Sequence, residues 1–236
     1  MASFPFLENQ PVVKLRPPRA QRFRYVVRVD LLGVEPPIWR RLAVASDLNL
    51  SQFHMILQVA MGWETCHLHA FHVWSKKRGR FIDSGLASQY SESPAGRSAP
   101  TEAKVQLSQL LGRPGGKLIY LYDFGDNWEH LVELEEVNDW EPGPFAQCLG
   151  GERACPPEDC GGVFGFEELV RQVAEANEST AEPAILDEDE DDDEFDDEDG
   201  EWDWEETDFD PEEFDVAAVN RRLQTEEGQG YAEPLL

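Results

Sequence analysis

The sequence from Lys117 to Glu135 reads KLIYLYDFGDNWEHLVELE. Residues 118–122 form an apolar run, and residues 128–135 alternate between apolar and polar side chains. Between these two segments lie Asp, Gly and Asn, the residue types that form tight turns. Alternation with a period of two on both sides of such a turn is typical of a β-hairpin. We therefore predict that the rest of the fold is built around this hairpin.

The flanking sequence predicts an α+β fold with a mostly antiparallel sheet and one main packed helix. Asn49 can cap a helix over residues 50–61, and Gly62 stands where a left-handed helix stop belongs. We expect further strands at 23–32, 38–44, 67–74 and 80–83, and shorter helices at 105–111 and 165–177. Residues 84–103, between the expected strand at 80–83 and the expected helix at 105–111, are predicted to form a long surface loop.

Composition divides the chain into four parts. We expect an extended basic and proline-rich arm at 1–22, a single α+β domain at 23–177, an acidic disordered linker at 178–209, and a short helix at 210–225 that can dock on the body. The formal net charge is -28, and 21 of the 48 acidic residues lie between Asp187 and Asp215, where there is no Lys or Arg. The acidic tail therefore carries most of the charge, and the body is only mildly acidic.

The sequence favours a cytoplasmic protein without a membrane span. No run of eighteen apolar residues is present, and the first residues lack the basic start and apolar stretch of a signal peptide. Four cysteines in a chain of this length then indicate reduced thiols or metal ligands in preference to disulfides.

Three of the four cysteines predict a metal site in a loop after the hairpin. Cys148, Cys155 and Cys160 are separated by six and four residues, among Gly-Gly and Pro-Pro pairs that could fold a loop around an ion. Zinc prefers four nitrogen or sulfur ligands, and His130 is the first candidate for the fourth, ahead of Cys66 or a histidine of residues 67–72. The alternative is a set of unliganded thiols.

An enzyme is the competing class. A metal-dependent hydrolase or a nucleic-acid-processing factor could place an open metal position among five side chains, namely His67, His69, Asp123, Asp126 and His130. The sequence contains no serine nucleophile elbow and no phosphate-cradling loop, and no nucleophile signature surrounds the cysteines. We therefore predict no catalytic residues and no organic cofactor, and we favour binding over catalysis.

Charge also bears on the partner. A basic stretch without acids between residues 9 and 29 could grip phosphates, through Lys14, Arg16, Arg19, Arg22, Arg24 and Arg28, although the charge of -28 disfavours direct DNA binding. The acidic tail, with Trp202 and Trp204, could contact a basic protein, imitate DNA, or serve as a solubilising spacer. We expect a protein partner or a protein–nucleic-acid assembly. Four aromatic side chains could line a binding site, although packing in the core accounts for their presence equally well. They are Trp63, Tyr122, Phe124 and Trp128.

Several motifs in a fixed order resemble one family. They are YDFGDNWEH at 122–130, ACPPEDCGG at 154–162, AMGW at 60–63 with HLHAF at 67–71, and FDPEEFD at 209–215 with VNRRL at 219–223. The chain resembles the plasmid pRiA ORF-three-like family, whose members are also labelled TnpR-type insertion-element passenger proteins. The resemblance covers about 23–177 and the last helix. It implies a compact α+β protein associated with mobile elements, without a defined activity, and the acidic tail is longer than the family pattern.

Overall fold

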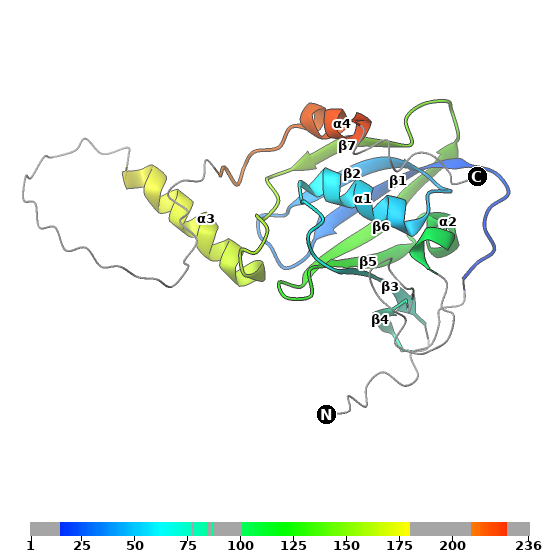
Figure 1. The fold of residues 1–236 in the computed structure, drawn as a ribbon, viewed down its shortest axis with the longest axis horizontal. Helices are drawn as coiled ribbons and strands as arrows, with labels where there is room; N and C mark the ends of the chain where they lie inside the picture. The colour runs from blue at the N-terminus through cyan, green and yellow to red at the C-terminus, as the bar shows by residue number, and fades with distance from the viewer. Residues whose placement is uncertain (1–14, 77, 85, 87–100, 180–208, 226–236) are drawn as a thin grey trace, which may run out of the picture.

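The computed structural model describes residues 15–76, 78–84, 86, 101–179 and 209–225, and within them seven strands form one antiparallel sheet. The strands are β1 (Phe23–Leu31), β2 (Trp39–Ala45), β3 (His69–Ser75), β4 (Arg80–Asp83), β5 (Lys117–Tyr122), β6 (Trp128–Asp139) and β7 (Ala146–Glu152). The helices are α1 (Leu50–Met61), α2 (Leu107–Leu110), α3 (Gly162–Ser179) and α4 (Val216–Gln224), with a 3-10 turn, η1 (Glu102–Lys104). The sheet order is β4-β3-β5-β6-β1-β2-β7, which confirms the predicted α+β class (Figure 1).

The predicted hairpin is confirmed as β5 and β6, near the middle of the sheet. Tyr122 pairs with Trp128 across the turn, and the Asn127 N–H donates to the Asp123 carbonyl at 2.7 Å. β6 continues to Asp139, beyond the predicted end, because its second half pairs with β1. β5 also pairs with β3, and β6 also pairs with β1, so the hairpin joins the two halves of the sheet.

α1 packs across one face of this sheet, as Figure 1 shows. Its first turn is closed by a capping box, in which the Asn49 side chain accepts from the Gln52 N–H and the Gln52 side chain accepts from the Asn49 N–H. Gly62 ends the helix with φ of 104°, a backbone angle that favours glycine. The prediction of a main helix bounded by Asn49 and Gly62 is confirmed, and local sequence alone accounts for it.

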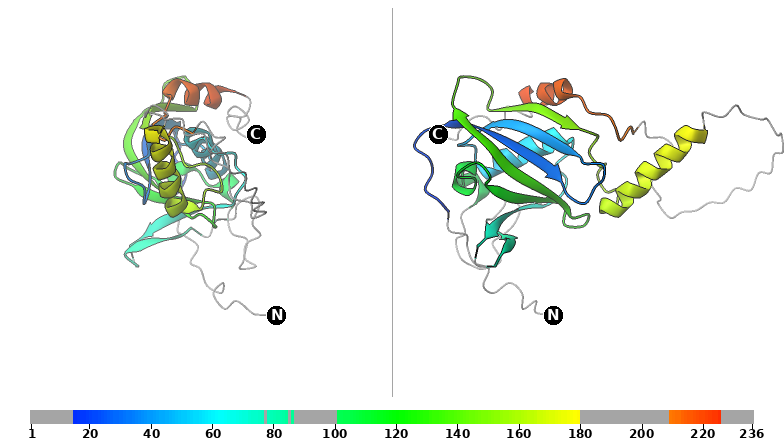
Figure 2. Two further views of the ribbon diagram at one scale, coloured as in Figure 1. Left: turned by 90° about the vertical axis from the view of Figure 1, so that its left-hand side faces the viewer. Right: turned by 180° about the vertical axis from the view of Figure 1, so that it is seen from behind.

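The opposite face of the sheet, which Figure 2 shows from behind as a ribbon, is not covered by α1. Charged side chains lie on this face. Arg28 pairs with Asp30, Arg41 pairs with Glu135, and Lys117 pairs with Glu133. In β6 these acids alternate with buried Val132 and Leu134, which face the core. The period of two in the sequence therefore reflects a sheet with one face on the core and one face in water.

The core beneath α1 contains a buried polar cluster. The Tyr120 hydroxyl lies 2.9 Å from Gln58 Nε2, which donates to it, and 2.7 Å from His54 Nδ1. The His54 ring stacks on His69 with 3.6 Å between ring centroids, and His69 Nε2 lies 2.9 Å from a Glu102 carboxylate oxygen. Burial, followed by the neighbouring His69, lowers the pKa of His54 to about 3. A neutral His54 ring can accept a hydrogen bond from the Tyr120 hydroxyl at Nδ1, so both buried groups have a hydrogen-bond partner.

β7 differs from the sequence prediction. Cys148 was placed in a cysteine loop, but it lies on this edge strand and pairs with Leu42 of β2. One of the glycines that suggested a loop, Gly151, is needed for close packing, because a Cβ at this position would lie 2.6 Å from the Phe214 ring. α3 also begins at Gly162, three residues before the predicted start.

Other predictions concern the two ends of the chain. The acidic run and its tryptophans Trp202 and Trp204 lie outside the described residues, as does Lys14. The arginines of the basic stretch contact the body: Arg16 and Arg19 donate to the carbonyls of Leu110 and Gly112, and Arg22 pairs with Asp47. Among the described residues, no helix combines the length and hydropathy needed to cross a membrane.

Protonation of buried His54 should destabilise the fold. Because its pKa in the folded chain is about 3, below the ordinary value of 6.5, the unfolded chain takes up a proton first as the pH falls. Stability is fully present above pH 6.5 and is lost towards pH 3, by about 3 kcal/mol at pH 4.5 from this group. Urea unfolding at several pH values should show a shallower decline between pH 6.5 and 4.5 for His54→Gln. An unchanged slope would contradict this assignment.

Candidate functional site

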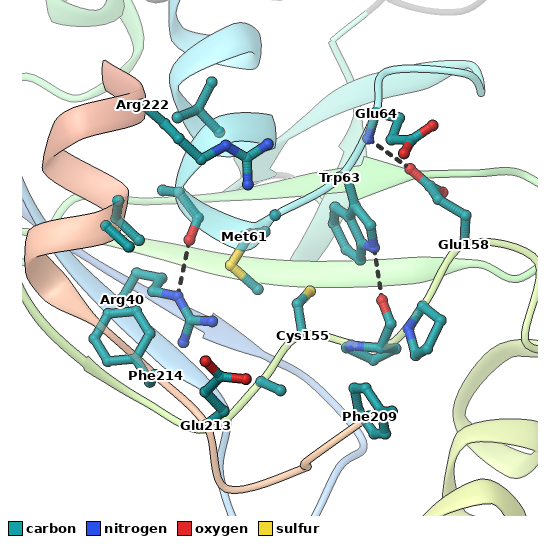
Figure 3. A pocket seen from close by; sticks show the side chains of 18 of the residues that line it. Arg40, Met61, Trp63, Glu64, Cys155, Glu158, Phe209, Glu213, Phe214 and Arg222 are labelled. Carbon is teal, nitrogen blue, oxygen red and sulfur yellow. Dashed lines mark hydrogen bonds between the residues drawn. The ribbon is translucent and has the colours of Figure 1, made fainter. Parts of the chain in front are cut away.

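A cleft of about 710 Å³ opens where three parts of the chain meet, shown in Figure 3. One wall is the end of α1 and the residues that follow it, from Val59 to Cys66. The second is the loop after β7, residues 154–159, and the third is the segment from Phe209 to Arg222 that leads into α4. These parts are far apart in the sequence, so the cleft exists only in the folded chain.

The Arg40 guanidinium holds these three parts together. This side chain of β2 is only 2% exposed, and its N–H groups donate to four backbone carbonyls, each at 2.9 Å. The acceptors are Ala60 of α1, Trp39 of β2, and Glu152 and Arg153 at the end of β7. Burial lowers the pKa of Arg40 from its ordinary value, but a guanidinium stays protonated in proteins. A permanent positive charge, that of Arg40, therefore lies beneath the cleft, and its hydrogen bonds join separate segments of the chain.

The third wall is attached to the body by several independent contacts. The Phe214 ring lies against the Arg40 guanidinium, with 4.1 Å from the carbon to the ring centroid. The Ala154 N–H donates to the Pro211 carbonyl at 3.0 Å. Glu212 pairs with Arg153 at 2.7 Å. On α4, the Asn220 side chain bonds both the N–H and the carbonyl of Cys148, which extends the edge of the sheet.

The thiols near the cleft are poor nucleophiles. Burial, as the largest cause, raises the pKa of the Cys155 thiol far above its ordinary value and raises that of Cys160 to about 12. Because these pKa values lie far above neutral pH, both thiols are protonated at pH 7. Only the thiolate form of cysteine is reactive, so neither group is an activated nucleophile. Trp63, which lies across from Cys155 in Figure 3, donates its Nε1–H to the Pro156 carbonyl at 2.9 Å and fixes the loop against α1.

The predicted zinc ligands do not meet. Cys148, Cys155, Cys160 and His130 are all described, but they do not form a group whose potential ligand atoms lie within 4.8 Å of one another. His130 is fully buried beneath Trp63, and its Nδ1 lies 3.1 Å from the Trp128 carbonyl and 3.2 Å from the Tyr120 carbonyl. The Arg40 guanidinium acts electrostatically on both Cys148 and Cys155 and lowers the pKa of each thiol, against the larger opposite effect of burial. Pairing of β7 with β2 places Cys148 in the sheet and not in the loop that carries Cys155 and Cys160, which spacing in the sequence cannot reveal.

The residues of the enzyme alternative are also dispersed. His69 belongs to the buried cluster under α1. Asp126 accepts from the Gly161 N–H at 3.1 Å. Only His67 and Asp123 of that set lie together, and they are joined by Asp159, whose potential ligand atoms fall in one group with theirs. A second group contains Cys66, His67 and Glu158. Sequence reasoning missed both Glu158 and Asp159, although they lie inside the quoted ACPPEDCGG motif.

Acidic side chains outnumber basic ones around the cleft. Six acids line it, Glu64, Glu158, Asp159, Asp210, Glu213 and Asp215, against Arg40 and Arg222. Between the acids, the lining is apolar and includes Met61, Trp63, Pro156, Phe209 and Phe214. The Arg40 guanidinium donates to four carbonyls, and Arg222 is the other cation of this lining. The site therefore combines an apolar floor with a negative rim.

Comparison with known proteins places this arrangement in a family. The model of the plasmid pRiA4b ORF-3-like protein family matches residues 24–218, and the chain belongs to that family. An uncharacterised protein of Sinorhizobium fredii, y4hQ, is 36% identical over 159 residues, which span 66% of this chain and 76% of the relative. The matched range includes the sheet, the cleft loop and the start of α4.

A solved structure shares the fold. The crystal structure of MM3350, a protein of unknown function from Methanosarcina mazei, matches with a TM-score of 0.63 and 30% sequence identity. The match covers 85% of this chain and 98% of that chain. The similarity extends over nearly the whole of the solved protein, so the two chains share the architecture described above.

Replacing Arg40 by lysine should destabilise the chain strongly. An ammonium cannot reach four carbonyls in three segments, and buried acceptors left unpaired cost about 1–3 kcal/mol each. We expect Arg40→Lys to lower the free energy of unfolding by about 3 kcal/mol or more, measured by urea denaturation. The control is Arg41→Lys, the next residue on the strand, whose ion pairs lie at the surface and should matter by less than about 1 kcal/mol. Equal losses in the two variants would argue against the special role of Arg40.

Removing the Phe214 ring should loosen the third wall while the sheet stays folded. Phe214→Ala deletes the contact with Arg40, worth about 1–2 kcal/mol. Hydrogen exchange should accelerate in residues 209–225 and at the Ala154 amide, which donates to Pro211. Phe164→Ala, at a ring that is 80% exposed on α3, provides the control. Unchanged exchange in 209–225 would show that the ring does not hold this segment.

Proposed function

We propose that this chain is a binding module that receives a basic segment of a partner protein in the cleft. The observation that carries the proposal is the pairing of an apolar floor with two carboxylates, Glu64 and Glu213, that have no hydrogen-bond partner or ion pair among the described residues. Glu213 projects into the cleft from below in Figure 3, and Glu64 lies at the opposite side beside Trp63.

The size of the cleft fits such a ligand. A volume of about 710 Å³ is within the range of small-ligand pockets and can hold a few side chains of a peptide. Lys and Arg carry long apolar stems with a charged end, so they can cover Phe209 and Pro156 while the cation reaches Glu64 or Glu213. The net charge of -28 supports a cationic partner, because it attracts basic chains over a long range and repels nucleic acid.

The wider setting is part of the same proposal. The family takes its name from an open reading frame of a plasmid, which supports a partner that acts on mobile elements, alone or within a protein–nucleic-acid assembly. A cytoplasmic location is consistent with four free cysteines, since a reducing compartment keeps thiols unpaired. The raised thiol pKa values favour binding over cysteine-based catalysis at this cleft.

Charge reversal within the cleft tests the proposal. A labelled peptide that alternates Arg or Lys with Leu would be titrated with the full-length chain, and its affinity measured by fluorescence polarisation. Glu64→Lys combined with Glu213→Lys should weaken binding at least about tenfold, equivalent to about 1.4 kcal/mol. An acidic peptide of the same pattern should not bind.

A matched double variant separates cleft binding from attraction to the acidic tail. Glu141→Lys combined with Glu167→Lys makes the same change in charge at two exposed positions away from the cleft. This control should keep the affinity of the unchanged protein. If the two double variants bind the basic peptide equally well, the cleft is not the binding site and the proposal fails.

A further inference from the structure

One imidazole nitrogen is surrounded by three carboxylates at the end of the cleft. His67 Nε2 lies 3.2 Å from Asp159 Oδ1, 3.7 Å from Glu158 Oε2 and 3.8 Å from Asp123 Oδ2. His67 comes from the loop between α1 and β3, Asp123 follows β5, and the other two belong to the loop after β7. Three distant segments therefore meet at His67, and the potential ligand atoms of His67, Asp123 and Asp159 lie within 4.8 Å of one another.

Two of the carboxylates are held by one oxygen and present the other. Glu158 Oε1 accepts from the Tyr122 hydroxyl and from the Glu64 N–H, each at 2.9 Å, while Oε2 faces His67. Asp123 Oδ1 accepts from the Gly125 N–H at 2.8 Å, while Oδ2 faces His67. Hydrogen bonds of this kind orient carboxylate ligands around metal ions in proteins.

The nitrogen at the centre has no hydrogen bond. His67 Nε2 is a buried atom without a hydrogen-bond partner, although the side chain as a whole is 25% exposed. None of the three carboxylate contacts has hydrogen-bond geometry. The arrangement therefore leaves a buried polar atom unpaired beside carboxylates, which is unfavourable unless a cation lies between them.

The separations suit a small divalent ion. Zinc lies about 2.0–2.2 Å from nitrogen and oxygen ligands, so ligand atoms at the corners of a tetrahedron are about 3.3–3.6 Å apart. The His67 Nε2 distances of 3.2 Å to Asp159 and 3.8 Å to Asp123 lie on either side of that value. Among the described ion pairs, these carboxylates meet His67 and no Lys or Arg.

Backbone strain at the same residues agrees with a functional cluster. Asp123 and Asp159 both have left-handed backbone angles, with φ of 53° and 57°. Residues other than glycine adopt this conformation at a cost, and such residues gather at ligand sites. The hairpin turn and the loop after β7 therefore hold both aspartates in strained positions that direct them to His67.

We propose that His67 Nε2, Asp123 and Asp159 bind a divalent transition-metal ion of the zinc class, with Glu158 beside this group. An imidazole ligand favours zinc over calcium and magnesium, which prefer oxygen ligands alone. Glu158 and Asp159 also line the cleft, so the ion would lie at its edge. This site is distinct from the cysteine set predicted from spacing, and it stands independently of the peptide-binding proposal.

Calorimetric titration of the metal-free full-length chain with zinc tests the site. Excess magnesium in the buffer occupies the acidic tail, which attracts hard cations without imidazole. We expect one zinc ion per chain with a dissociation constant below about 10 µM. Asp123→Asn should weaken binding at least about tenfold, and asparagine keeps both the bond to Gly125 and the left-handed backbone. His67→Gln should weaken it similarly.

Controls decide whether a loss belongs to the site or to folding. Asp126→Asn makes the same substitution in the same hairpin turn and should bind zinc like the unchanged chain. Zinc should raise the melting temperature of the unchanged protein and of Asp126→Asn, but not of Asp123→Asn, because only binding to the folded state stabilises it. The proposal is overturned if no saturable zinc site exists, or if zinc binds all these variants with equal affinity.

Discussion

The buried guanidinium of Arg40 is the contact on which the described structure most depends. A charge taken out of water is costly unless its hydrogen-bonding groups find partners. Here four carbonyls from α1, β2 and the end of β7 supply them, and the Phe214 ring covers one face of the guanidinium. The five donors of arginine, arranged in a plane, are the only side-chain group that can join so many backbone acceptors at once. The edge of the sheet, the main helix and the C-terminal segment are therefore fixed relative to one another.

The cleft is a consequence of this arrangement. Because the segment from residue 209 onwards returns to cover β7, its acids are placed opposite those that follow α1. Phe166 contacts Phe209, and Leu223 of α4 is buried, so the segment is packed into the core. The same loop after β7 that bonds Trp63 also carries Glu158 and Asp159 towards His67. The two proposed functions of the site thus depend on one loop, through different residues.

Local sequence determined what could be predicted. The hairpin and α1 follow from alternation, turn residues and caps, all of which act within a few positions along the chain. Family motifs indicated the α+β class and extended the resemblance to the last helix. Cys148 was misplaced because its strand consists partly of glycines, and the need for Gly151 arises from the Phe214 ring more than sixty positions away.

The candidate site was less predictable for the same reason. Arg40 looks like its neighbour Arg41 in the sequence, yet one is buried among carbonyls and the other lies at the surface with Glu135. His130 was chosen as a ligand by its position near the cysteines, but period-two alternation in β6 also assigns it to the core face with Val132. The meeting of His67 with Asp123 and Asp159 depends on loop conformations set by tertiary contacts.

The central claim is that the cleft around Arg40 is the surface that meets a partner. Backbone chemical shifts of the full-length chain, recorded by NMR with and without a basic peptide, test it most directly. We expect the changes to concentrate in residues 59–66, 154–159 and 209–222, with the Trp63 indole N–H among the most affected. Changes confined to the acidic run between residues 187 and 208, with the cleft residues unaffected, would contradict the claim.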